Sequence, residues 1–147
     1  MSTDPGPVVV VCDGASRGNP GPAGIGAAVY DVSGEVLAEI AEGIGEATNN
    51  VAEYQAMISG LARAHELGAT VVTVKADSLL MIQQMKGVFK VKAVHLKQLH
   101  AEGQAIARLF DRVSYQHVPR EENTHADRLA NEGVDRWLAG DRGLYSS

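Results

Sequence analysis

Two aspartates stand at the ends of strongly apolar segments, which is an uncommon place for a charge. Asp13 follows the run Val8–Cys12, and Asp77 follows the run Thr70–Ala76. Continuous β-branched runs of this kind predict strands that are buried on both faces of a sheet. Where two such strands are parallel neighbours, their carboxylates emerge at the same end of the sheet, which is where open α/β sheets keep their sites.

Two further acids are predicted to reach the same end of the sheet on helices. Glu53 lies in the first turn of a helix expected over 51–68, on the face assigned to the sheet. Asp127 lies near the start of a last helix, 124–138, and shares a face with its apolar residues, so we expect it to point inward. The four converging acids are therefore Asp13, Glu53, Asp77 and Asp127.

Each acid also has a simpler interpretation when it is taken alone. Glu53 follows Asn50 by three positions, which is the spacing of a capping box. Asp77 precedes Ser78 and can cap the next helix, while Asp127 gains from the dipole of its own helix. Taken together, however, four acids at one sheet end repel strongly unless a cation lies among them.

Hard divalent cations are the natural partners of such a cluster. Mg²⁺ prefers carboxylate and water oxygens, and two ions roughly 4 Å apart can activate a water and stabilise a leaving oxygen in phosphoryl transfer. Zinc is not indicated, because Cys12 is the single cysteine and the five histidines lack paired ligand spacing. We expect two Mg²⁺ ions, with Mn²⁺ as a substitute.

Length and composition indicate one ordinary globular domain. The chain has 147 residues, a net charge of −5 and a pI near 5.5. This charge argues against coating nucleic acid by bulk positive charge, although metal-binding acids also make a nucleic-acid enzyme acidic. The single cysteine, with no secretory signal and no membrane-spanning run, predicts a soluble, cytoplasmic protein that makes no membrane contact. We expect a monomer with a domain over 8–138 and tails over 1–7 and 139–147.

The predicted order of elements is β-β-β-α-β-α-α-β-α. It describes an α/β fold with a mixed five-stranded sheet, in which three antiparallel strands are followed by parallel additions and flanked by helices. The expected strands are 8–13, 23–31, 35–43, 70–77 and 112–118, and the expected helices are 51–68, 78–86, 95–110 and 124–138.

Four segments resemble the ribonuclease H type 1 family in order and spacing: Asp13–Gly24, Thr48–Tyr54, Lys75–Ser78 and Asn123–Asn131. The resemblance implies the RNase H-like fold and makes the four acids the catalytic, metal-binding residues. It places Asp13 between the two ions. It also implies endonucleolytic hydrolysis of the RNA strand of an RNA–DNA hybrid, leaving a 3′-hydroxyl and a 5′-phosphate.

Recognition of the hybrid requires contacts to the 2′-hydroxyl, which both donates and accepts hydrogen bonds. Several polar residues match family positions that touch sugars or bases in the minor groove, and Thr48 matches one that holds a DNA phosphate near a helix N-terminus. Turn and cap duties are the alternative for these residues. The expected substrate-binding residues are Gly14, Ser16, Asn19, Thr48, Asn49, Asn50 and Lys90.

Three features depart from the family pattern. The long basic extension that grips the hybrid in some members is reduced to Lys86–Lys92, so we expect modest, strongly salt-dependent affinity. The loop that often carries a histidine contains Arg120 and Glu122 instead, and either can take its role in product release. Leu79 stands where some members have a polar residue.

Other functions fit the sequence less well. A non-catalytic hybrid-binding module of the same fold predicts the loss of at least one of the four acids, yet all are present. The glycines between 18 and 26 have the wrong spacing for a dinucleotide-binding oxidoreductase. The 3′–5′ exonucleases of related fold resemble one another in carrying the motif Asp-x-Glu on the first strand. In this sequence, Ala15 stands two positions after Asp13, where that motif has Glu.

Overall fold

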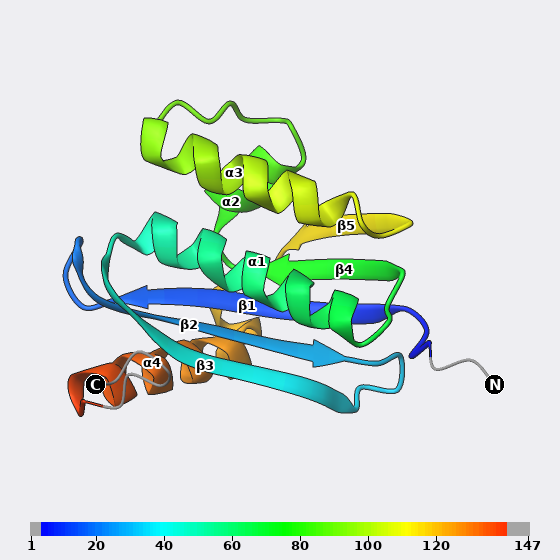
Figure 1. Ribbon diagram of the computed structural model, residues 1–147, viewed down its shortest axis with the longest axis horizontal. Helices are drawn as coiled ribbons and strands as arrows, with labels where there is room; N and C mark the ends of the chain where they lie inside the picture. The colour runs from blue at the N-terminus through cyan, green and yellow to red at the C-terminus, as the bar shows by residue number, and fades with distance from the viewer. Residues whose placement is uncertain (1–3, 141–147) are drawn as a thin grey trace.

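The computed structural model describes residues 4–140 and forms a five-stranded sheet with helices on both faces (Figure 1). The strand order is β3-β2-β1-β4-β5. The strands are β1 Val8–Ser16, β2 Gly21–Tyr30, β3 Val36–Ala47, β4 Val71–Ala76 and β5 Arg112–His117; the helices are α1 Asn49–Glu66, α2 Leu79–Met85, α3 Val94–Ala107 and α4 Thr124–Leu138, and a short 3-10 helix spans Arg120–Glu122.

The predicted order and the mixed sheet are confirmed. Strand β1 lies in the middle, antiparallel to β2 and parallel to β4, while β3 and β5 form the edges. Its central place follows from its sequence, because Val8, Val10 and Cys12 are all fully or almost fully buried against α1 and its neighbours. The carboxyl ends of β1 and β4 point to the same side of the molecule (Figure 1).

Strand β1 continues past its predicted end. The expected strand stops at Asp13, where glycine and proline begin to predict a turn, but pairing with β2 extends to Ser16, which lies opposite Ala23. The tight turn is therefore limited to 17–20. The difference arises because a long antiparallel partner supplies hydrogen bonds that local turn preference does not reveal.

Helices α1 and α4 cover opposite faces of the sheet. Gly60 of α1 lies so close to β1 that a Cβ there would be 2.6 Å from the Val10 Cγ1 atom. Gly26 of β2 lies against α4 in the same way, with a would-be Cβ 2.3 Å from the Ala126 carbonyl oxygen. Small residues thus bring both helices close to the central strands.

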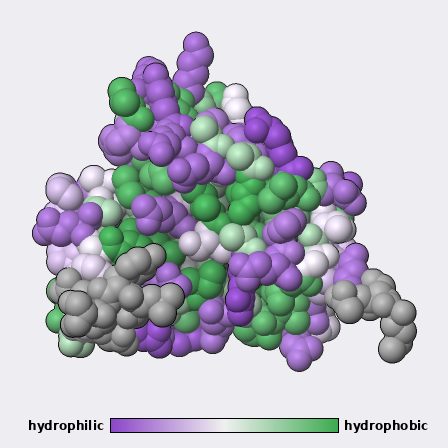
Figure 2. All heavy atoms as spheres, in the orientation of Figure 1, coloured by the Kyte–Doolittle hydropathy of each residue, from purple (hydrophilic) through white to green (hydrophobic). Residues whose placement is uncertain are grey.

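The face that carries α1 and α3 is mostly polar, with hydrophobic patches between the polar residues (Figure 2). None of the helices within residues 4–140 has the length and apolarity needed to cross a membrane. Of the two predicted tails, 1–7 and 139–147, residues 1–3 and 141–147 lie outside the described part of the chain.

Candidate active site at the carboxyl ends of β1 and β4

The two strand-end aspartates come from neighbouring parallel strands. The pairing of β1 with β4 runs as far as Val11 opposite Lys75, and each chain then leads within two residues to its aspartate. Asp13 is 8% exposed, and the Asp77 side chain is 11% exposed. Both carboxylates therefore lie at the same end of the sheet and are largely removed from water.

Helix α1 brings Glu53 to this end because it packs directly on Gly14. A Cβ at Gly14 would lie 2.4 Å from the Glu53 backbone nitrogen, so only glycine allows this approach. The helix begins two residues earlier than predicted, with Thr48 as its N-cap accepting a hydrogen bond from the Val51 N–H at 3.3 Å. Glu53 is consequently in the second turn, and its interpretation as part of a capping box with Asn50 is wrong.

The cap of α2 removes a second simple alternative. Its N-cap is Ser78, whose hydroxyl accepts a hydrogen bond from the Met81 N–H at 3.2 Å. Asp77 therefore precedes the cap and does not serve as one.

Helix α4 brings Asp127 to the site from the opposite face of the sheet. Asp13 lies directly opposite Gly26 in the β1–β2 pair, and Gly26 is the residue on which the first turns of α4 rest. The start of the helix is tied to β1 by Asn123, which is 2% exposed and donates from Nδ2 to the Cys12 carbonyl oxygen at 3.0 Å. In the sequence, Asn123 appears only as part of a motif. Its position just before the helix was the one local signal that it ties the helix to β1.

The electrostatics of the site reflect the convergence of the acids. Burial raises the pKa of Asp13 to about 8, and the charges of Asp77, Asp127 and Glu53 and a side-chain hydrogen bond with Asp127 act in the same direction. Burial also raises the pKa of Glu53, against the hydrogen bond from Ser78. The acids thus interact although they lie on β1, on α1, on α4 and just after β4.

Each acid outside β1 has a partner of its own in this arrangement. Arg120 Nε lies 3.8 Å from Asp77 Oδ2, Ser78 hydrogen-bonds to Glu53, and Asn131 donates from Nδ2 to Asp127 Oδ1 at 3.3 Å. Within residues 4–140, no three His, Cys, Asp or Glu side chains stand ready to hold one metal ion together. The set nevertheless consists of carboxylates alone, which is the donor chemistry that Mg²⁺ and Mn²⁺ prefer.

Six of the seven predicted substrate-binding residues gather around the β1–β2 turn and the start of α1. Asn19 Oδ1 accepts a hydrogen bond from the Asn49 N–H at 3.1 Å, and Ser16 Oγ donates to the Ala47 carbonyl oxygen at 2.8 Å. Their turn and cap duties are therefore real, while Asn49 and Asn50 remain exposed at the first positions of the helix.

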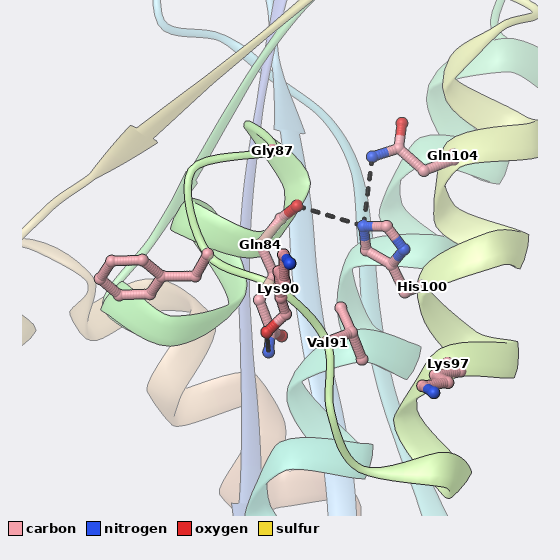
Figure 3. Close-up of a pocket in the computed structure, with 8 residues that line it drawn as sticks. Gln84, Gly87, Lys90, Val91, Lys97, His100 and Gln104 are labelled. Atoms are coloured by element: carbon pink, nitrogen blue, oxygen red, sulfur yellow. Dashed lines mark hydrogen bonds between the residues drawn. The ribbon is translucent and has the colours of Figure 1, made fainter.

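The seventh residue, Lys90, lies on the loop of residues 86–93 between α2 and α3. It lines an open cavity of about 370 Å³ together with Lys97 and His100 (Figure 3). The cavity wall is braced by a hydrogen bond between the His100 Nε2 atom and the Gln84 carbonyl oxygen at 3.1 Å. Sequence reasoning missed His100, which is separated from Gln84 by 16 positions and carries no motif.

Comparison with known proteins places this geometry in a family. Residues 11–133 match the family model described as reverse transcriptase-like. The crystal structure of RNase H1 from Halobacterium salinarum superposes with a TM-score of 0.86 at 40% identity, covering 88% of this chain and 98% of that one. The chain belongs to the ribonuclease H family. The predicted fold and family are thereby confirmed, including the absence of a long extension between α2 and α3.

Two further ribonuclease H relatives define the extent of the likeness. LC11-RNase H1, which was isolated from compost and solved in complex with an RNA/DNA hybrid, has a TM-score of 0.85 at 42% identity, covering 89% of this chain and 99% of that one. A bifunctional protein of Mycobacterium tuberculosis is 53% identical over 129 residues, which are 87% of this chain but 35% of that protein. The chain thus spans about a third of the length of the first curated relatives it matches.

Proposed function

We propose that this ribonuclease H domain cuts the RNA strand of RNA–DNA hybrids within its length, leaving 3′-hydroxyl and 5′-phosphate ends. The observation that carries the proposal is the convergence of Asp13, Glu53, Asp77 and Asp127 at one end of the sheet. Support also comes from the similar RNase H1 whose structure contains an RNA/DNA hybrid.

The four acids are proposed to hold two Mg²⁺ ions, or Mn²⁺ in their place. When bound, such ions supply an activated attacking water and stabilise charge on the leaving 3′ oxygen. Asp13 comes from the central strand between α1 and α4 and is proposed to contact both ions, with Glu53 and Asp77 on one side and Asp127 on the other. Occupation of the site would offset the burial and the mutual repulsion that raise the pKa of Asp13.

Of the two loop residues considered for product release, Arg120 is the better candidate. Its Nε atom lies 3.8 Å from Asp77 Oδ2, and its charge opposes the rise in the pKa of Glu53. Its side chain is 86% exposed, so it can reach an incoming or departing phosphate. Glu122, in contrast, lines a separate hollow of about 450 Å³ beside Lys75.

The predicted substrate-binding residues divide between two regions of the protein surface. The β1–β2 turn and the start of α1 present Asn19, Asn49 and Asn50 for contacts with sugars and the minor groove. The loop of residues 86–93 contributes Lys90 and neighbouring lysines, whose exposed charges favour binding that weakens with salt. A cytoplasmic location and a monomeric state stay predictions.

Cleavage of an end-labelled RNA–DNA hybrid by the purified protein in Mg²⁺ tests the proposal, beside duplex RNA, duplex DNA and an EDTA control. We expect metal-dependent internal cutting of the RNA strand in the hybrid alone, and 3′-hydroxyl and 5′-phosphate termini on the products. Hybrid that is bound but never cut would overturn the enzymatic proposal and support a non-catalytic binding module.

A further inference from the structure

We propose that Arg17 in the β1–β2 turn is a positioning residue that fixes the Asp127 carboxylate by acting through Asn131, which rests on the metal role proposed above for Asp127. Arg17 lies at the opposite end of the sequence from α4, and no motif connects the two. A chain of contacts runs from the turn to the helix.

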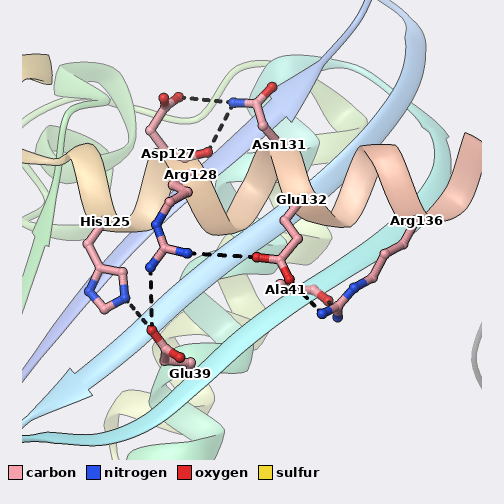
Figure 4. Close-up of polar contacts among 8 residues, drawn as sticks. All are labelled: Glu39, Ala41, His125, Asp127, Arg128, Asn131, Glu132 and Arg136. Atoms are coloured by element: carbon pink, nitrogen blue, oxygen red, sulfur yellow. Dashed lines mark hydrogen bonds and ion pairs between the residues drawn. The ribbon is translucent and has the colours of Figure 1, made fainter.

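The first link is between Asn131 and Asp127, one helical turn apart. Asn131 Nδ2 lies 3.3 Å from Asp127 Oδ1 and 3.0 Å from the Asp127 carbonyl oxygen, so it donates to both (Figure 4). A neutral donor that holds one carboxylate oxygen fixes the rotation of that carboxylate without competing for a cation. Contacts of this kind orient metal-binding side chains.

The second link determines which end of the Asn131 amide faces the carboxylate. An amide presents an acceptor oxygen on one side and a donor nitrogen on the other, and it can occupy its site in either orientation. Arg17 Nη2 lies 3.4 Å from Asn131 Oδ1 and 3.4 Å from the Asn131 carbonyl oxygen. Because a guanidinium only donates, it holds the amide oxygen on its own side and leaves the nitrogen for Asp127.

The third link anchors the guanidinium itself. Arg17 Nη1 lies 2.7 Å from Asp135 Oδ1, one turn further along α4. The two ends of the guanidinium fork are therefore occupied by different residues of one helix, which is a geometry that a lysine ammonium does not reproduce. Without Arg17, the amide oxygen loses the donor that holds it, and only the two Asp127 acceptors still set the orientation of the amide.

The turn is also fixed to the helix on the other face of the sheet. Asn19 Oδ1 accepts from the Asn49 N–H at the start of α1, which is the helix that carries Glu53. Arg17 and Asn19 thus connect one short turn to both helices that bring acids to the site. Of these two residues, Arg17 is the one connected to an acid, because it contacts the Asn131 amide that donates to Asp127.

Arg136 provides a matched control on the same helix. It pairs with Glu132 Oε1 at 2.6 Å and donates to the Ala41 carbonyl oxygen at 3.0 Å, so it anchors α4 to β3 (Figure 4). Its side chain is 50% exposed, against 41% for Arg17. Removal of Arg136 therefore loosens the helix by a similar amount through contacts that do not include Asn131.

The test measures Mn²⁺ affinity by calorimetry or by the spin-resonance signal of the free ion, together with thermal stability. We expect about 10-fold weaker affinity for Asn131→Ala and about 3- to 10-fold weaker affinity for Arg17→Ala. Arg136→Ala should bind Mn²⁺ as the unchanged protein does. At saturating metal, hybrid cleavage by Arg17→Ala should recover to within about 2-fold, because the catalytic acids are all present.

A double variant decides whether Arg17 acts through Asn131. If it does, Arg17→Ala combined with Asn131→Ala binds Mn²⁺ no more weakly than Asn131→Ala alone. Additive losses would overturn the proposal, and so would normal affinity in Arg17→Ala or an equal loss in Arg136→Ala. If Arg17→Ala does not fold, Asp135→Asn is used instead, because it removes the carboxylate that anchors the guanidinium and keeps Arg17 itself. Unchanged Mn²⁺ affinity in that variant overturns the proposal.

Failure of the proposed function would give a different result. An unchanged protein that binds no Mn²⁺ and cuts no hybrid overturns the metal role of Asp127 and this proposal with it. Tight Mn²⁺ binding and cleavage by the unchanged protein, with no effect of Arg17→Ala, overturns the positioning role of Arg17 alone.

Discussion

Helix α4 carries charged residues on two sides, and the two sides differ in how their charges are paired (Figure 4). On the side that faces β3, acids and bases alternate: Arg136 pairs with Glu132, and Arg128 Nη2 lies 3.7 Å from Glu39 Oε2. On the other side, Asp127 points toward a cluster of acids, and it is one of the groups that raise the pKa of Asp13.

The charges that face β3 stabilise the fold, whereas the acids at the end of the sheet do not. The pairs facing β3 are half-exposed and of opposite sign, so they stabilise the protein slightly and need nothing further. The acids at the sheet end repel one another in a largely buried place, which costs stability unless a cation joins them. A helix that keeps both arrangements in adjacent turns indicates that the second is retained for function.

The largest expected effect is on the acidic side. Asp77→Asn should keep the fold but lower hybrid cleavage at least about 100-fold, because a neutral amide is a poor ligand for a hard cation. Glu132→Gln, which changes an acid on the β3 side of α4, should leave cleavage unchanged. Turnover is measured at saturating Mg²⁺ and hybrid, and near-normal turnover by Asp77→Asn would overturn the two-metal proposal.

Removing a charge from the acidic cluster should stabilise the metal-free protein. Asp13 is buried beside three acids, and it costs free energy whether it stays charged or takes up a proton far above its ordinary pKa. Asp13→Asn is expected to raise the free energy of unfolding by about 1 to 3 kcal/mol in EDTA. Denaturant titration measures the gain.

Mg²⁺ should reverse that ranking by stabilising the unchanged protein and not Asp13→Asn. Binding to the native state alone raises the free energy of unfolding in proportion to the logarithm of ligand concentration. A variant that is less stable than the unchanged protein in EDTA would show that the acids do not repel in the folded state.

Removal of an acid from the paired side should have the opposite sign. Glu39 is the common partner of His125, which hydrogen-bonds to it, and of Arg128. Glu39→Ala is expected to lower the free energy of unfolding by about 0.5 to 1 kcal/mol, since these pairs are partly exposed. Cleavage per folded molecule should not change. A loss of cleavage at full folding would mean that the paired side also shapes the site.

The sequence predicts what is locally encoded. β-branched runs and small residues give the element order, and strand-end aspartates such as Asp13 and Asp77 are visible because a charge after such a run is unusual. His125 shows the limit of local evidence, because nothing in its sequence neighbourhood indicates that its side chain is only 22% exposed and bonded to Tyr30 and Glu39. Tyr30 and Glu39 are far from His125 in the chain, and the pairing of the strands determines where they lie.

The supporting contacts of the site were not predictable for the same reason. Arg17 and Asn131 are 114 positions apart, and Asn123 and Cys12 are 111 positions apart. Either asparagine alone resembles an ordinary residue of a cap or a helix surface. Only the packing of α4 on Gly26 brings the two asparagines to β1 and to the turn that follows it, and that packing depends on the whole sheet.

The smallest expected effect compares two exposed arginines with equally long ion pairs. Arg120 lies 3.8 Å from Asp77 at the acidic cluster, and Arg128 lies 3.7 Å from Glu39 on the paired side. Removing either should change the free energy of unfolding by no more than about 0.5 kcal/mol, because both arginines are exposed and both pairs are long. Arg120→Ala should nevertheless lower kcat/KM for the hybrid about 2- to 4-fold at low salt, since it removes the cation that faces the acids and the incoming phosphate. Arg128→Ala should have no such effect, and equal kcat/KM values for the two variants would show that Arg120 takes no part in handling the substrate.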